Sequence, residues 1–217
     1  MMLGARTGAW SNGVGATPAI WIGGGTTYFN SEVPFGDGHV IVDVKFYRKF
    51  APREGQYIFG GTFNSQRFDA CVYTSEFWYV GFGNNNANIY FSSGGAMLYN
   101  AVNRTVYDVD YVSKRVSFSA NGHSLLASKS FNFKKINFSP YIGARKSDNS
   151  ISEPTHDAGI ISIDIDKDGS PFRRYRPRVI GGAVGLFDEV NNLFHAPLNG
   201  GDNITYIADI TNEGVVL

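Results

Sequence analysis

The sequence has a single cysteine, Cys71, among its 217 residues. One thiol excludes an internal disulfide and any cysteine-rich metal site, so the fold must be stabilised by its own apolar core. Long apolar runs are missing as well, and the first residues lack a charged segment followed by an apolar one. We therefore expect neither a membrane span nor a signal peptide.

An excess of charge of one sign is also lacking. The 19 lysine and arginine residues balance the 19 aspartate and glutamate residues. Charged residues make up 18% of the chain, which is below the quarter or so found in average soluble domains. A neutral chain has no strong field to attract nucleic acid or an anionic membrane, so we expect neither as a partner.

Glycine and aromatic residues are abundant. There are 26 glycines, and aromatic residues make up 15% of the chain, with phenylalanine and tyrosine far ahead of tryptophan. This composition favours short strands joined by tight turns. The length suits one large core, so we predict a single domain over residues 18–217. Residues 1–17 are small and polar with no apolar periodicity, and we interpret them as a flexible arm.

Alternation of apolar and polar residues predicts many short strands. In HVIVDVKFY, residues 39–47, every second residue from Val40 to Phe46 is apolar, which is the pattern of a half-buried strand. The dipeptides Asn121-Gly122 and Asp168-Gly169 tolerate positive φ and predict hairpin turns. The other predicted strands cover residues 56–63, 70–74, 77–83, 89–91, 97–99, 105–112, 115–120, 123–130, 139–144, 160–166, 171–178, 182–188 and 192–196.

No segment of ten residues shows an apolar stripe with the 3.6-residue period of a helix. Short strands that follow one another about every ten residues are typical of sandwiches. We therefore predict an all-β fold with very little helix, in which two antiparallel sheets pack as a jelly-roll β-sandwich.

One acidic run fits the first half of a calcium loop, D-x-D-x-D-G, at Asp164, Asp166, Asp168 and Gly169. A complete loop has a bidentate glutamate at its twelfth position, where this chain has Tyr175. The isoleucines at 161, 163 and 165 alternate as a strand, which puts Asp164 and Asp166 on its solvent face and Asp168 in a turn. We favour the hairpin and expect no cofactor; calcium at the three aspartates is the weaker alternative.

Catalytic constellations are not evident. Hydrolysis of a sugar polymer needs two carboxylates roughly 5 to 10 Å apart, which one strand of a sandwich can supply at i and i+2 or i+4. The six glutamates lie in or beside turn-like segments without such a partner, and the pairs Asp108/Asp110 and Asp164/Asp166 lack a glutamate. The four histidines are scattered, without metal-ligand spacing. We predict that the chain is not an enzyme.

The aromatic-rich stretch over residues 73–91 is the predicted binding surface. Alternation places Trp78, Val80 and Phe82 on the core face and leaves the intervening tyrosine pointing outward, next to a run of asparagines. Aromatic faces stack on sugar rings, and amides both donate to and accept from sugar hydroxyls. The asparagines alternatively serve turn geometry. The predicted sugar-binding residues are Tyr73, Tyr79, Asn84, Asn85 and Asn86.

Residues 160–199 carry a motif that resembles a known family. A strand and a polar turn lead to an aromatic-Arg-Pro step, and a Gly-x-x-Gly-Leu-Phe-Asp segment then precedes an aromatic residue. The motif positions are Tyr175, Arg176, Pro177, Gly182, Gly185, Leu186, Phe187, Asp188, Phe194 and Asn199. This segment resembles the end of concanavalin A-like, LamG-type jelly-roll domains of phage and prophage virion proteins. The chain before it fits more loosely, and Arg178 stands where the family usually has cysteine.

The resemblance implies a glycan-binding or structural module. We expect a non-enzymatic phage virion-associated protein, in a tail, a fibre or the capsid surface, that binds host or environmental glycans. Its expected partners are glycans, other virion proteins contacted by the arm 1–17, and further copies of itself. Its expected location is the virion, assembled in the host cytoplasm. A purely structural decoration or joint without a sugar site is the first alternative, and a glycoside hydrolase is the disfavoured one.

Overall fold

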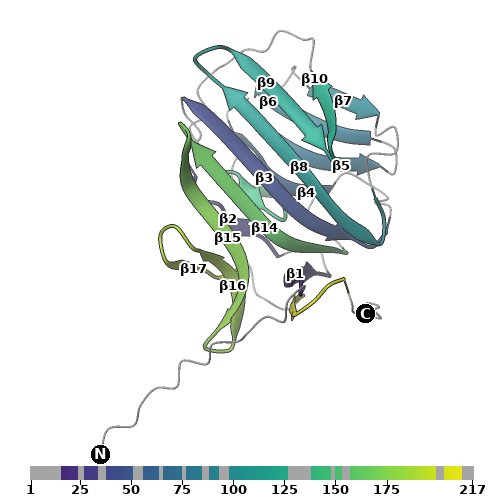
Figure 1. Ribbon diagram of the computed structural model, residues 1–217, viewed down its shortest axis with the longest axis vertical. Coiled ribbons are helices and arrows are strands. Elements are labelled where there is room, and N and C mark those ends of the chain that lie inside the picture. The colour runs from purple at the N-terminus through teal and green to yellow at the C-terminus, as the bar shows by residue number, and fades with distance from the viewer. Residues whose placement is uncertain are drawn as a thin grey trace, which may run out of the picture.

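The structure is a computed structural model of the full chain (Figure 1). It describes residues 16–23, 27–33, 38–50, 56–63, 66–74, 77–84, 88–92, 98–126, 138–147, 150–152, 157–198 and 203–211. The described residues form strands and turns and no helix, as the sequence predicts. Among them there is accordingly no helix long and apolar enough to span a membrane.

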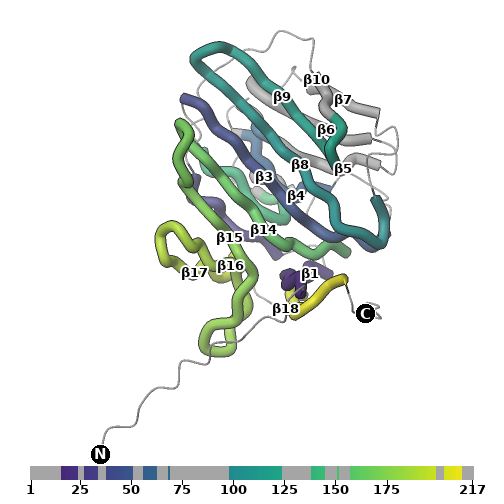
Figure 2. The backbone as a smooth tube through the Cα atoms, viewed as in Figure 1, coloured from purple at the N-terminus to yellow at the C-terminus, as the bar shows by residue number. Residues whose placement is uncertain are grey.

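The described strands form two sheets that lie one behind the other (Figure 1). The larger, ten-stranded sheet has the order β10 (His123–Leu126), β9 (Arg115–Ala120), β8 (Ala101–Asp110), β3 (His39–Arg48), β14 (Ala158–Lys167), β15 (Ser170–Ile180), β16 (Ala183–Asp188) and β17 (Leu193–His195). Two further strands extend it, because β1 (Ala19–Ile22) pairs with both β14 and β18 (Ile204–Ile207). Figure 2 shows β1 and β18 side by side at one end of this sheet.

The smaller, eight-stranded sheet has the order β13 (Ser150–Ser152), β12 (Arg145–Ser147), β4 (Gln56–Phe63), β5 (Gln66–Thr74), β6 (Phe77–Asn84) and β7 (Asn88–Ser92). In the same sheet, β11 (Tyr141–Ile142) pairs with β2 (Phe29–Asn30) and with β4. Its strand pairs are antiparallel except for β12 against β4. The predicted all-β sandwich of two antiparallel sheets is confirmed.

The main core lies between the two sheets. Alternate residues of β3 from Val40 to Phe46 are buried, as the apolar alternation predicts. Phe68 of β5 connects the layers, because its ring lies 6.0 Å from Phe59 in its own sheet and 5.5 Å from Tyr107 of β8 in the facing sheet. Burial of such apolar side chains is the dominant favourable term in the stability of the sandwich.

A second apolar cluster covers the other side of the large sheet near β1. Its members are Ala19, Trp21, Tyr47, Ile161, Ile207 and Ile210. A bulge in β14 between Ile160 and Ser162 explains why Ile161 is there, whereas Ile163 and Ile165 lie in the main core. The predicted alternation of the three isoleucines on one face is therefore wrong at Ile161, because the extra residue of a bulge reverses the register.

The predicted hairpin turns are present, while some strand limits differ. Asn121 and Gly122 have φ of 47° and 84°, and Asp168 and Gly169 have φ of 50° and 78°, as hairpin turns of this kind require. The strand predicted over residues 105–112 begins four residues earlier and ends at Asp110. Residues 98–100 form no strand, contrary to the prediction for 97–99. The short strands β1, β2, β12, β13 and β18 were not among the predicted ranges.

Candidate functional site

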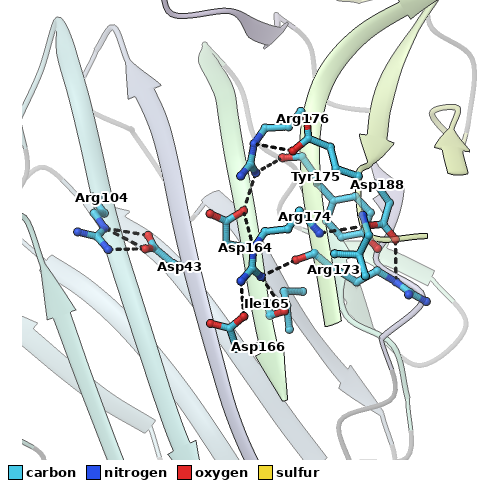
Figure 3. Close-up of polar contacts among 12 residues, drawn as sticks. Asp43, Arg104, Asp164, Ile165, Asp166, Arg173, Arg174, Tyr175, Arg176 and Asp188 are labelled. Atoms are coloured by element: carbon cyan, nitrogen blue, oxygen red, sulfur yellow. Dashed lines mark hydrogen bonds and ion pairs between the residues drawn. The ribbon is translucent and has the colours of Figure 1, made fainter. Parts of the chain in front are cut away.

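The face of the large sheet that points away from the core carries paired charges (Figure 3). Arg104 of β8 and Asp43 of β3 pair with an N–O distance of 2.5 Å. On the neighbouring strands, Arg176 donates to Asp164 at 2.5 Å, and Arg174 donates to Asp166. Each of these three carboxylates therefore meets a guanidinium on an adjacent strand, which is the cross-strand pairing that stabilises sheets.

The three aspartates considered as calcium ligands make other contacts in the structure. Asp164 and Asp166 lie on the solvent side of β14, as predicted, but their carboxylates face arginines. Asp168 lies in the hairpin turn and accepts a hydrogen bond from the backbone nitrogen of His39 at 2.8 Å. Among the described residues no three histidine, cysteine, aspartate or glutamate side chains come together as a metal site. The arrangement fits a hairpin and does not fit calcium, whose ligands are converging oxygens.

Asp188 anchors the ribbon formed by β15, β16 and β17. Its side chain is fully buried and accepts hydrogen bonds from the backbone nitrogens of Arg174 and Val190 and from the side chain of Asn191, at 3.0, 3.1 and 2.7 Å. Burial raises the pKa of this carboxyl, but these hydrogen bonds and the charge of Arg173 lower it more, so the pKa lies below its ordinary value. The acidic end of the Gly-Leu-Phe-Asp motif is thus structural.

Hydrogen bonds hold the loop at residues 31–33, after β2, against this ribbon. Tyr175 of β15, whose side chain is buried, donates its hydroxyl to the carbonyl of Ser31, and burial raises its pKa. Arg173 donates to the carbonyl of Glu32 at 3.4 Å. The Asn30 side chain accepts from the Glu32 nitrogen at 3.0 Å. Glu32 itself has φ of 50°, a conformation that costs a residue with a side chain on the order of 1 kcal/mol or more and is enriched at functional sites.

A cleft of about 170 Å³ opens between this loop and β17. We call it the Glu32 cleft, and its lining residues are Asn30, Glu32, Phe194, His195, Ala196 and Leu198. The Glu32 carboxylate is half exposed and lies 4.0 Å from the Nδ1 of His195, whose side chain is 9% exposed. The His195 Nε2 is buried and has no hydrogen-bond partner within the described residues.

The strand β17, which forms one wall of the cleft, is fixed by packing. A Cβ atom on Gly185 would lie 2.5 Å from Cζ of Phe194 and 2.5 Å from the carbonyl oxygen of His195, so the ring and the strand approach as closely as they do because that residue is glycine. His195 stacks edge-on against Tyr175 with ring centroids 5.3 Å apart. A carboxylate, an amide and an imidazole thus meet at the cleft, while the Phe194 ring packs over Gly185 on the opposite face of β17 from the His195 side chain. Carboxylates and amides are polar groups that can recognise sugar hydroxyls.

A second hollow, of about 250 Å³, lies at the other end of the sheet face. Its lining residues are His39, Asp108, Asp110, Ser113, Arg115, Val116 and Ser117. Inside it His39 Nε2 lies 2.6 Å from Asp108. Hydrogen bonds from the side chain and backbone of Ser113 lower the pKa of Asp110 below its ordinary value. No phenylalanine, tyrosine or tryptophan lines this hollow, and its histidine and two aspartates are already engaged with each other or with the adjacent turn.

The predicted sugar-binding residues are only partly described. Tyr73 lies in β5, at the point where the pairing with β6 shifts register. Tyr79 lies in β6 opposite Cys71 and Tyr90, and Asn84 is the last residue of β6. Tyr73 and Tyr79 thus lie toward one end of the β5–β6 ladder, whereas Asn84, which pairs with Gln66, lies at its other end. Asn85 and Asn86 lie outside the described residues. The predicted binding surface stays a prediction.

Sequence reasoning missed the Glu32 cleft. Its two sides come from residues 30–32 and 194–198, near opposite ends of the chain. Only tertiary contacts, such as the backbone hydrogen bond from Leu198 to Tyr28, bring these segments together. The scattered histidines gave no signal, although His195 meets Glu32 and His39 meets Asp108 in the folded chain. The one local signal is Asn30, because asparagine two residues before a strained position is typical of a side-chain-capped turn.

No protein-family model matches the sequence, and no curated protein is similar to it. Similar folds do occur among solved structures. A predicted carbohydrate-binding protein from Bacteroides ovatus superposes with a TM-score of 0.62 at 12% identity over 89% of this chain, which spans 60% of that protein's length. A heptameric SAP-like pentraxin from Limulus polyphemus gives a TM-score of 0.54 at 14% identity, covering 69% of this chain and 76% of the pentraxin.

The third comparison is the CBM40 module of the Ruminococcus gnavus IT-sialidase, bound to α2,3-sialyllactose. It gives a TM-score of 0.52 at 15% identity, covering 70% of this chain and 94% of that module. At these identities the likeness shows the fold and nothing finer. The fold is a concanavalin A-like jelly-roll sandwich, shared with carbohydrate-binding modules, a pentraxin and laminin LG domains.

Proposed function

We propose that this chain is a non-enzymatic glycan-binding module and that the Glu32 cleft is its sugar site. The observation that carries the proposal is the meeting of the half-exposed Glu32 carboxylate, the Asn30 amide and the His195 imidazole at one cleft. The fold supports it, because a CBM40 module with the same sandwich has been solved with sialyllactose bound.

The polar lining groups have defined roles in this proposal. The hydroxyls of a sugar donate to the Glu32 carboxylate and accept from the Asn30 side-chain nitrogen. The loop needs little rearrangement, since Tyr175 and Arg173 already bond its backbone. Preorganisation of this kind lowers the entropic cost of binding.

A hydrolase is the less favoured reading of the same residues. Among the residues that line the Glu32 cleft, only Glu32 has a carboxylate, whereas glycosidases use two. The other hollow holds Asp108 and Asp110, but the pKa of Asp110 is lowered. A general acid requires the opposite shift, so that it carries a proton at neutral pH.

We further propose that the module belongs to a phage virion, as part of a tail, a fibre or the capsid surface. Support comes from the motif in residues 160–199, which resembles the end of virion jelly-roll domains. In this setting the arm 1–17 contacts other virion proteins, and several copies assemble so that weak single sites gain avidity. The virion is then the location of the protein.

A structural joint without a sugar site is the second candidate. The observation that favours it is the concentration of exposed apolar side chains on the ribbon, among them Val179, Ile180 and Leu193. Exposed apolar surface of this kind marks protein contacts. The two candidates differ in whether purified protein binds any sugar.

A glycan array with three variants tests the proposal. Wild-type protein is expected to bind a defined set of glycans, and Glu32→Gln is expected to weaken that binding about tenfold or more, because a hydrogen bond to a charged group is worth about 1.5–3 kcal/mol. Glu189→Gln, a carboxylate of similar exposure outside the cleft, is the matched control and should bind normally.

Tyr79→Ala tests the predicted surface on β6 in the same screen. Loss of binding in this variant with full binding by Glu32→Gln would move the sugar site to the smaller sheet. A wild-type protein that binds no glycan on the array would overturn the glycan-binding proposal and favour the structural joint.

A further inference from the structure

The ribbon of β15, β16 and β17 carries most of the exposed apolar surface. Of the eight large apolar side chains that are exposed among the described residues, five lie between residues 179 and 198. Three of these flank or belong to β17, namely Val190, Leu193 and Leu198, which are 43%, 49% and 40% exposed. Apolar residues concentrated in this way mark a contact surface.

The strand β17 is also a free sheet edge. It is the last strand in the order of the large sheet, and among the described residues its backbone pairs with β16 alone. Natural edge strands are commonly protected by charges, proline or a bulge. The residues of β17 are Leu193, Phe194 and His195, and its ladder to β16 runs without a register shift. The strand is short, which limits edge pairing, but it carries no lysine, proline or bulge.

We infer that β17 pairs with β17 of a second copy of this chain. Antiparallel pairing of one strand with its own copy is isologous, so it forms a closed two-fold dimer. The backbone groups of the two edges would bond each other and continue the large sheet from one copy into the next. Val190, Leu193 and Leu198 would lose their exposure to water around this junction.

The charges near the edge suit a second copy of the same chain. Glu189, in the turn that leads into β17, and Arg178, two strands in from the edge, are both exposed, and their side chains lie 3.4 Å apart. Glu32, at the other side of β17, is negative and half exposed. A rim with both signs can meet its own two-fold image without net repulsion, and the formal net charge of the whole chain is zero. A rim of one sign would oppose self-association.

The two-fold axis of such a pair stands perpendicular to the sheet, so both copies present the same sheet face to the same side. The two Glu32 clefts, each beside its β17, would then open on one side of the dimer. This consequence rests on the proposed function, but the pairing itself does not, because it can be measured without any sugar.

Sedimentation velocity across a wide concentration range tests the pairing. Wild-type protein is expected to sediment as a dimer or a multiple of dimers, and Leu193→Lys as a monomer, because a buried lysine at the junction cannot be solvated or paired. Val112→Lys replaces an 83% exposed residue in the turn after β8 and is the matched control, expected to assemble like the wild type. At a concentration low enough for both lysine variants to be monomeric, equal Tm values show that Leu193→Lys is folded.

Hydrogen exchange locates the contact. Those amides of residues 193–195 that point away from β16 are expected to exchange slowly in the concentrated wild type and quickly on dilution or in Leu193→Lys. A wild type that stays monomeric overturns the inference, as does a Leu193→Lys variant that assembles normally. A dimer in which these amides exchange freely also overturns it, since the copies would then meet elsewhere, for example through the arm. Each of these results leaves the glycan-binding proposal to its own test.

Discussion

Replacement of the buried Asp188 is expected to be among the most destabilising single changes in the ribbon. Asp188→Ala leaves two backbone donors and the Asn191 amide without their acceptor inside the protein, and it leaves the nearby Arg173, 3.5 Å away, without its counter-ion. Loss of one partner of a buried charged network costs about 3–5 kcal/mol, so we expect the free energy of unfolding to fall by about 4 kcal/mol.

The assay is urea-induced unfolding followed by intrinsic fluorescence at neutral pH. For a chain of this size the expected loss corresponds to a drop in Tm of roughly 10 °C. Asp188→Asn keeps one oxygen for the backbone donors but points an amide at Asn191, so we expect about half the loss. Asp43→Ala is the control, because Asp43 pairs with an arginine that is 57% exposed and such a pair contributes about 1 kcal/mol or less.

The lowered pKa of Asp188 predicts that the stability of the protein depends on pH. The pKa of Asp188 is lower in the folded chain than in the unfolded one, where it is about 3.9. Its contribution to stability is therefore fully present above about pH 4 and is lost as the pH falls through the lower, folded value. The difference between the wild type and Asp188→Asn should shrink below about pH 4. A difference that grows in acid, or an Asp188→Ala variant within 1 kcal/mol of the wild type, would refute this reasoning.

Three further changes test other parts of the structure. Glu32→Gly should raise the free energy of unfolding by about 1 kcal/mol, because glycine adopts the positive φ at this position without strain. The same variant should lose sugar binding. A variant that is no more stable than the wild type in chemical denaturation would show that Glu32 is not strained. Gly185→Ala should lower stability by about 1–3 kcal/mol, since its Cβ would collide with Phe194 and the backbone of β17. Calcium or EDTA should leave Tm unchanged, because Asp164 and Asp166 face arginines; a rise in Tm with calcium would restore the metal site.

Most of the fold could be predicted from local patterns. The alternation in residues 39–47 depends on neighbouring residues alone, and the structure buries the predicted face of β3. The Asn121-Gly122 turn is likewise local, since both residues adopt the positive φ that their types tolerate. Patterns of period two and turn dipeptides are strong signals because each is set by backbone sterics within a few residues.

Features that depend on distant partners could not be predicted in this way. The bulge that moves Ile161 into the second cluster arises in the pairing of β14 with β3, and no residue type announces it. β1 is short and fully buried, so it lacks the alternation of a half-buried strand. The Glu32 cleft needs the loop after β2 and the strand β17 to meet, which tertiary contacts such as the Tyr175 hydroxyl to Ser31 bring about.

Chemical-shift mapping with the best glycan of the array tests the central claim most directly. The account predicts that the amide signals of residues 30–32 and 194–198, which surround the Glu32 cleft, shift on titration and that Glu32→Gln abolishes these shifts. Shifts confined to β5 and β6 around Tyr79 would contradict the cleft and favour the surface that the sequence predicts. A titration with no shifts anywhere would contradict glycan binding itself.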